Sequence, residues 1–75
     1  MSEIHRFTVI VEPCEEGGYY AECPVFPGCH VEGDTYEDTL GEMESAVIAF
    51  IEDYKKDGEA IPDDSVTVTS LKIAV

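Results

Sequence analysis

The spacing of apolar residues between positions 35 and 58 narrows the possible folds of this chain more than any other feature. Seven of them recur three or four positions apart and so lie along one side of an α-helix: Tyr36, Leu40, Met43, Val47, Phe50, Ile51 and Tyr54. Thr35 can cap the start, with Asp38 in place of the usual capping-box glutamate, and Gly58 can end the helix. The apolar side of this helix needs a second layer, which the rest of the chain must supply.

Three short segments before the helix have the composition of β-strands. Residues 4–12 are rich in Phe, Thr, Val and Ile and stop at Pro13, which has no N–H to donate to a sheet. Residues 19–23 follow a loop with two consecutive glycines, and residues 29–32 follow the turn Pro24-Val25-Phe26-Pro27-Gly28. These segments predict an antiparallel meander, with Phe26 holding the second turn to the edge of the core.

Residues 66–75 predict a last strand after the helix. Its apolar residues change parity near Ser70, which a β-bulge there would reconcile. The order of elements is then β-β-β-α-β, and a right-handed crossover makes the last strand parallel to the first. We therefore predict an α+β fold with sheet order 3-2-1-4 and one helix packed on one face, so that the other face is uncovered. Residues 1–75 are expected to form a single domain.

The charge balance excludes several classes of function. Seventeen Asp and Glu against four Lys and Arg give a formal net charge of −13. Nucleic-acid binding needs clustered Lys and Arg, and anionic membranes attract basic segments, so neither is expected as a direct partner. No apolar run approaches the roughly 20 residues of a bilayer span. The N-terminus lacks the layout of a secretory signal, so we expect a cytoplasmic protein with reduced cysteines.

Carboxylates on the uncovered sheet face raise the alternative of a metal-dependent ribonuclease. Glu12, Glu22 and Glu32 share the parity of that face, but such residues are ordinary on a half-polar sheet. A nuclease would need several converging carboxylates to hold its metal ions, one of them near the middle of the first strand, where Thr8, Val9 and Ile10 stand instead. We therefore predict no catalytic residue.

The cysteines raise the alternative of a zinc site. Cys23, Cys29, His30 and His5 lack the close paired spacings of structural zinc sites. Cys23 and Cys29 are instead expected in the core, as small apolar residues. No metal ligand and no cofactor are predicted.

The uncovered face is the best candidate for a protein contact. It is expected to show Ile10, Tyr20, Glu22, His30 and Glu32, with Asp34 next to the start of the helix. Tyrosine is enriched at the energetic centres of interfaces, so Tyr20 is a candidate anchor. The alternative is an ordinary solvated face with two scattered apolar residues, and the sequence favours neither.

Four short motifs in order resemble the HicB-like antitoxin family. They are Gly18-Tyr19-Tyr20-Ala21-Glu22-Cys23-Pro24, Phe26-Pro27-Gly28-Cys29, Glu32-Gly33-Asp34-Thr35 and Gly58-Glu59-Ala60-Ile61-Pro62. The chain departs from the family pattern at Asp38-Thr39, where Glu-Ala is usual, and at Gly41. Many relatives continue into a DNA-binding segment, whereas this sequence stops at Val75, so the resemblance is to a short form without operator binding.

This resemblance implies a partial ribonuclease-H-like fold and an antitoxin that neutralises a HicA-like toxin, a small basic mRNA endonuclease. A strongly acidic protein would be attracted to the basic RNA-binding surface of such a toxin. A homodimer or higher homo-oligomer is also expected, because the core is small and the last strand would leave an open edge. The alternative is a stand-alone structural or regulatory module without a toxin.

Overall fold

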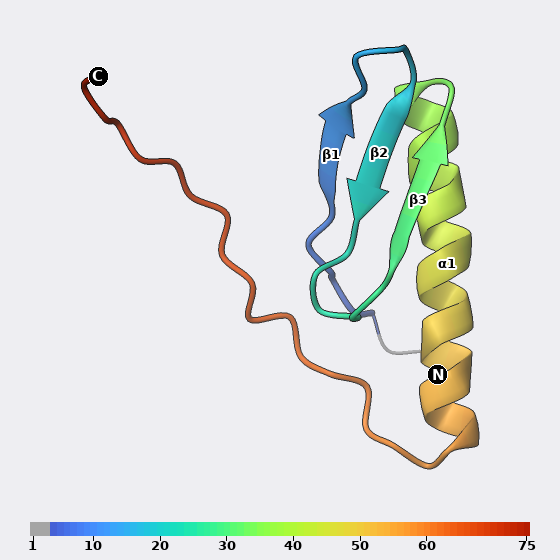
Figure 1. The fold of residues 1–75 in the computed structure, drawn as a ribbon. Helices are drawn as coiled ribbons and strands as arrows, with labels where there is room; N and C mark the ends of the chain where they lie inside the picture. The colour runs from blue at the N-terminus through green and yellow to red at the C-terminus, as the bar shows by residue number, and fades with distance from the viewer. Residues whose placement is uncertain (1–3) are drawn as a thin grey trace.

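Three antiparallel strands and one long helix make up the regular structure in the computed structural model, which describes residues 4–75 (Figure 1). The elements are β1 (Ile10–Pro13), β2 (Tyr19–Glu22), β3 (His30–Gly33) and α1 (Tyr36–Lys56). This arrangement confirms the predicted α+β class. Within the described residues, no helix is both long enough and apolar enough to span a bilayer.

The strands form the predicted meander, with β2 in the centre. Ala21 of β2 pairs with Val11 of β1 on one side and with Val31 of β3 on the other. β1 is shorter than predicted and begins only at Ile10. The reason lies in β2, which ends at Glu22 because the chain turns at the following prolines, so no strand runs beside residues 4–9.

Both ends of the helix are capped as the sequence predicts. The Thr35 hydroxyl accepts a hydrogen bond from the N–H of Asp38 at 3.0 Å. At the other end Gly58 has a φ of +72°, a value that favours glycine. Its N–H donates to the carbonyl of Lys55, and the N–H of Glu59 donates to that of Tyr54, which is the Schellman arrangement.

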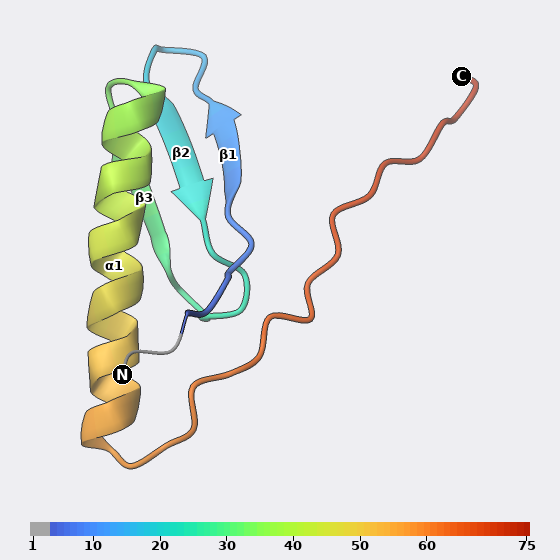
Figure 2. The same cartoon turned by 180° about the vertical axis from the view of Figure 1, so that it is seen from behind.

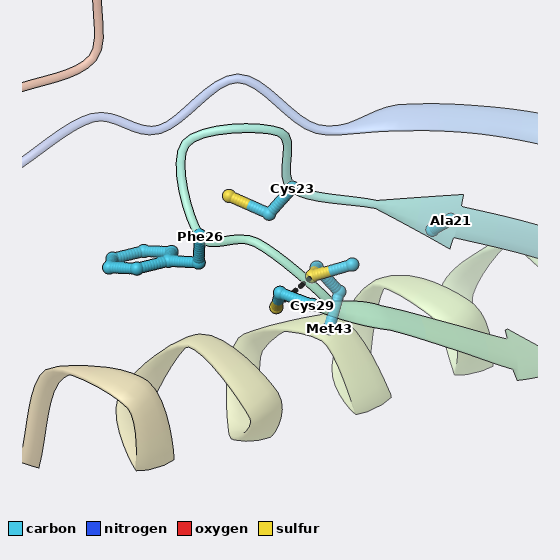
Figure 3. Close-up of a cluster of buried hydrophobic side chains, with 5 residues drawn as sticks. All are labelled: Ala21, Cys23, Phe26, Cys29 and Met43. Atoms are coloured by element: carbon cyan, nitrogen blue, oxygen red, sulfur yellow. Dashed lines mark hydrogen bonds between the residues drawn. The ribbon is translucent and has the colours of Figure 1, made fainter. Parts of the chain in front are cut away.

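The core lies between the helix and the β2–β3 half of the sheet. Five apolar residues are buried there: Ala21, Cys23, Phe26, Cys29 and Met43 (Figure 3). The Phe26 ring, 1% exposed, lies 5.1 Å from the ring of Phe7 and 5.5 Å from that of Phe50. The prediction that Phe26 holds its turn to the core is confirmed, as is the burial of both cysteines.

Residues 59–75 contain no helix or strand, so the fourth strand predicted over residues 66–75 does not form in this structure. The chain from Ser65 onward, here called the C-terminal arm (residues 65–75), runs away from the sheet in both views (Figures 1 and 2). Just before the arm, the Asp64 carboxylate accepts hydrogen bonds from the N–H groups of both Thr8 and Val66. The observed order β1-β2-β3 matches the 3-2-1 part of the predicted sheet.

Candidate protein-binding surface

The sheet has one face without a helix, because α1 covers only the other. Val11, Ala21 and Val31 share the helix-facing parity and pack against the core. Side chains alternate along a strand, so the neighbouring positions point to the opposite side. That side, here called the open face, carries the five predicted residues Ile10, Tyr20, Glu22, His30 and Glu32.

Register brings these five residues into two adjacent rows. Ile10, Glu22 and His30 form one row across the three strands. Tyr20 lies opposite Glu32 in the next row, and its ring stacks on that of His30 with centroids 5.8 Å apart and planes 26° apart. The open face therefore carries a stacked aromatic pair bordered by carboxylates. Tyr20 is partly buried by its neighbours, whereas His30 and Glu32 are exposed.

Asp34, the sixth predicted residue, lies apart from the open face. It is exposed in the turn between β3 and the helix and lines a shallow acidic hollow with four other carboxylates: Glu32, Glu37, Asp38 and Glu42. Glu32 belongs to both the open face and this hollow and joins them. Of the residues that line the hollow, Glu32 and Asp34 were predicted by number as contact residues, whereas the helical members were not. The spacing of four residues between Asp38 and Glu42, which puts both on one side of a helix, is the signal that could have found them.

The sequence also did not predict an apolar groove on the helix side of the sheet. The helix contacts β2 and β3 but not β1, so its outer apolar flank faces the chain segment before β1 across a gap. The groove is lined by Phe7 and Val9 from that segment, by Val47 and Ile51 from the helix, and by Ile61 beyond it. The exposed residues Leu40 and Ile48 continue the flank. Leu40 belongs to the predicted helical stripe, which the sequence pattern alone assigns to the core, and the three strands leave it exposed.

Three side chains have a pKa that differs from the ordinary value. Hydrogen bonds from the Thr8 hydroxyl (2.7 Å) and from the N–H groups of Val66 and Thr8 lower the pKa of Asp64. Burial raises the pKa of the Cys23 and Cys29 thiols, and the nearby Cys29 adds to the effect on Cys23. The Cys29 thiol is directed at the sulfur of Met43, 3.8 Å away, as an ordinary core contact (Figure 3).

The carboxylates considered for metal binding stand in different rows. Glu12 and Glu32 lie on opposite outer strands with Tyr20 between them, and Glu22 belongs to the neighbouring row. Across residues 4–75 no group of three or more His, Cys, Asp or Glu side chains is arranged to hold a metal ion.

Known proteins resemble this chain over most of its length. UPF0150 protein ssr1765 of Synechocystis is 34% identical over 73 residues, covering 97% of this chain and 92% of that protein. UPF0150 protein Ta0767 of Thermoplasma acidophilum is 38% identical, covering 80% of this chain and 87% of its own length. Antitoxin HicB 1 of Photorhabdus laumondii is 42% identical over 57 residues. These are 76% of this chain but 37% of that antitoxin.

A family profile gives the assignment. The sequence profile described as HicB_like antitoxin of bacterial toxin-antitoxin system matches residues 7–73. The match includes the three strands, the helix and most of the C-terminal arm. The chain belongs to the HicB-like antitoxin family.

Proposed function

We propose that this protein is the antitoxin of a type II toxin–antitoxin pair and neutralises a basic, HicA-like mRNA endonuclease by binding it. The observation that carries the proposal is the family membership of a chain with a net charge of −13. The protein performs no bond-breaking itself. It acts in the cytoplasm as a single unit over residues 1–75.

The contact surface in this proposal is the open face together with the acidic hollow. Carboxylates attract the basic surface of an RNA-binding enzyme from a distance and speed the encounter. Tyr20 then supplies the apolar area of the contact, because its ring stacks on that of His30 and the residue lies between Glu12 and Glu32 in the sheet. Such a surface can occupy the place of the RNA phosphates without being cleaved.

The complete fold in this proposal is the partial ribonuclease-H-like sheet of order 3-2-1-4. The three observed strands supply positions 3, 2 and 1. The outer edge of β1 supplies the place for the fourth strand, and the C-terminal arm has the β-branched composition of one. A homodimer or higher homo-oligomer follows from the small core and from this open edge.

Binding measurements with a HicA-like protein test the proposal. The doubly neutralised variant Glu22→Gln/Glu32→Gln should slow association at low salt by roughly tenfold, because it weakens the steering field at the contact. The control Glu59→Gln/Asp63→Asn makes the same change in net charge beyond the helix end and should leave association near that of the unmodified protein. Equal slowing by both variants would show that only total charge matters and would remove the open face as the contact.

Tyr20→Ala tests the anchor separately. It should raise the dissociation constant by about 30-fold, the effect of losing an interface hot spot of about 2 kcal/mol. His30→Ala, which removes the stacking partner, should have a smaller effect in the same direction.

Cleavage of RNA by the isolated protein with magnesium, abolished by Glu12→Gln/Glu22→Gln/Glu32→Gln, would contradict the non-enzymatic role. Absence of any toxin binding would favour a stand-alone interaction module.

A further inference from the structure

A second hollow lies where the open face meets the turn between β2 and β3. Its lining combines three side chains of the open face, Tyr20, Glu22 and His30, with the turn residues Pro24 and Pro27. It has a volume of about 280 Å³ and is here called the turn hollow. The acidic hollow lies beside Gly33, so the two hollows stand at opposite ends of β3.

The fold fixes the walls of the turn hollow before any ligand enters. The N–H of Cys23 donates to the carbonyl of Cys29 at 3.0 Å, and the N–H of Phe26 donates to the carbonyl of Cys23 at 3.1 Å. All three side chains are buried on the core side of the turn (Figure 3). Pro24 and Pro27 have backbone φ angles that their rings restrict. A ligand of this hollow would therefore lose little binding free energy to ordering the protein.

The charge of the lining selects a cation. Glu22 is its single acidic side chain, and among residues 4–75 no Lys or Arg lines the hollow. The net charge of −13 attracts cations to the molecule from a distance and repels phosphates. A nucleotide is therefore disfavoured, although aromatic rings are platforms on which bases can stack.

The shape of the lining selects a planar cation. The rings of Tyr20 and His30 are stacked, with centroids 5.8 Å apart, beside the Glu22 carboxylate. A guanidinium group stacks on aromatic faces and pairs with a carboxylate through two N–H groups, whereas a lysine ammonium is a hydrated point charge. The methylene groups of an arginine also pack against apolar walls such as the two proline rings. Arginine is thus the side chain that uses every part of this lining.

We propose that the turn hollow receives an arginine side chain of the basic partner, with the guanidinium stacked on the Tyr20–His30 pair and bound to the Glu22 carboxylate. This assignment rests on the proposed function, which supplies a basic protein as the partner. It adds the chemistry of one contact and a preference for arginine over lysine at that point.

Nuclear magnetic resonance titration of the full chain tests the preference without a toxin. The probes are the blocked tripeptides acetyl-Gly-Arg-Gly-amide and acetyl-Gly-Lys-Gly-amide, at about pH 8, where an ordinary imidazole is neutral. The arginine peptide should bind roughly fivefold more tightly and shift the signals of the Tyr20 ring and of Glu22. Equal affinity for the two peptides, or shifts that map to the acidic hollow, would overturn the proposal.

Variants separate the ring from the carboxylate. Tyr20→Leu keeps apolar bulk and should reduce the preference for arginine to less than twofold, whereas Tyr20→Phe keeps the ring and should retain it. Glu22→Gln should weaken binding of both peptides, and Glu12→Gln, the same change of charge on β1 outside the hollow, should have little effect. An arginine preference that survives Tyr20→Leu, or equal weakening by both glutamine variants, would contradict the assignment.

Toxin binding measured in parallel distinguishes the hollow from the proposed function. A protein that prefers the arginine peptide but binds no HicA-like protein would support the hollow and overturn the proposed function. A protein that binds a HicA-like protein but shows no preference between the peptides would overturn the hollow and leave the proposed function in place.

Discussion

At the scale of single residues, Gly33 at the end of β3 and Gly41 inside the helix have opposite surroundings. A Cβ atom on Gly33 would lie 2.5 Å from the Thr39 hydroxyl and 2.9 Å from its backbone nitrogen. Thr39 is fully buried and its hydroxyl donates to the Thr35 carbonyl, so it cannot move aside. Gly41, by contrast, has nothing within 4 Å of the same position. Gly33 is required by the packing of β3 against the helix, and Gly41 is not.

The two alanine substitutions should therefore change stability in opposite directions. Gly33→Ala should lower the free energy of unfolding by about 1–3 kcal/mol, the usual effect of overpacking a close contact. Gly41→Ala should raise it by about 1 kcal/mol, because alanine is the better helix former and the site is open. Denaturant titration followed by circular dichroism measures both. A Gly33→Ala protein as stable as the parent would show that the junction is loosely packed.

The three cysteines should differ in reactivity. Cys23 and Cys29 are 1% and 3% exposed, and burial raises the pKa of both thiols, so little reactive thiolate forms near neutral pH. Cys14 lies in the hairpin loop and is only partly covered. An alkylating reagent should modify Cys14 in the native protein and the other two only after unfolding. Mass spectrometry counts the modified sites, and Cys14→Ser should remove the native reaction. Rapid modification of all three in the native state would contradict the buried core.

At the scale of the elements, the helix could be predicted from the sequence almost to the residue. Its caps are local interactions, and Thr35 and Gly58 encode them within a few positions. The residues of the open face could be predicted for a similar reason, because side chains alternate between the two faces along a short strand. The acidic hollow and the apolar groove depend instead on where the helix crosses the sheet. That placement arises from packing over β2 and β3, which no local pattern specifies.

The sequence could not show that the predicted last strand does not form, because strand formation depends on an available partner. Residues 66–75 have β-forming composition, and that composition alone suggested a strand. In the structure, Asp64 engages Thr8 and Val66, and the chain leaves the sheet. A carboxylate fifty-six positions from its donor has no signature in the sequence around either residue.

The contact between Asp64 and Thr8 should depend on pH. Hydrogen bonds lower the pKa of the folded Asp64 carboxyl below its ordinary value of 3.8. The stabilisation is therefore present above the unfolded pKa and is lost as the pH falls through the lower, folded value. The difference in unfolding free energy between the parent and Asp64→Asn should be constant near neutrality and shrink below about pH 4. Asp63→Asn, at the exposed neighbour, is the control for the loss of one negative charge. A difference that stays constant down to pH 2 would rule out the carboxylate as the acceptor.

At the scale of the whole molecule, the excess negative charge opposes the compact state. Carboxylates outnumber bases by thirteen, and they crowd around the helix start and the open face. Raising salt from roughly 10 mM to 150 mM shortens the screening length from about 30 Å to about 8 Å and should raise the melting temperature by several degrees. Scanning calorimetry measures the shift, with sucrose at equal osmolality as the uncharged control. An unchanged melting temperature would mean that local contacts already compensate the charge.

The helix is much longer than the sheet that it covers. Its 21 residues span about 31 Å, whereas each four-residue strand spans about 13 Å. Backbone pairing therefore fastens only one end of the molecule, and the other end is held by the rings of Phe7, Phe26, Phe50 and Tyr54. Apolar contacts weaken on cooling more than backbone hydrogen bonds do. Cooling should accordingly loosen first the end that the aromatic rings hold, while the paired strands stay formed.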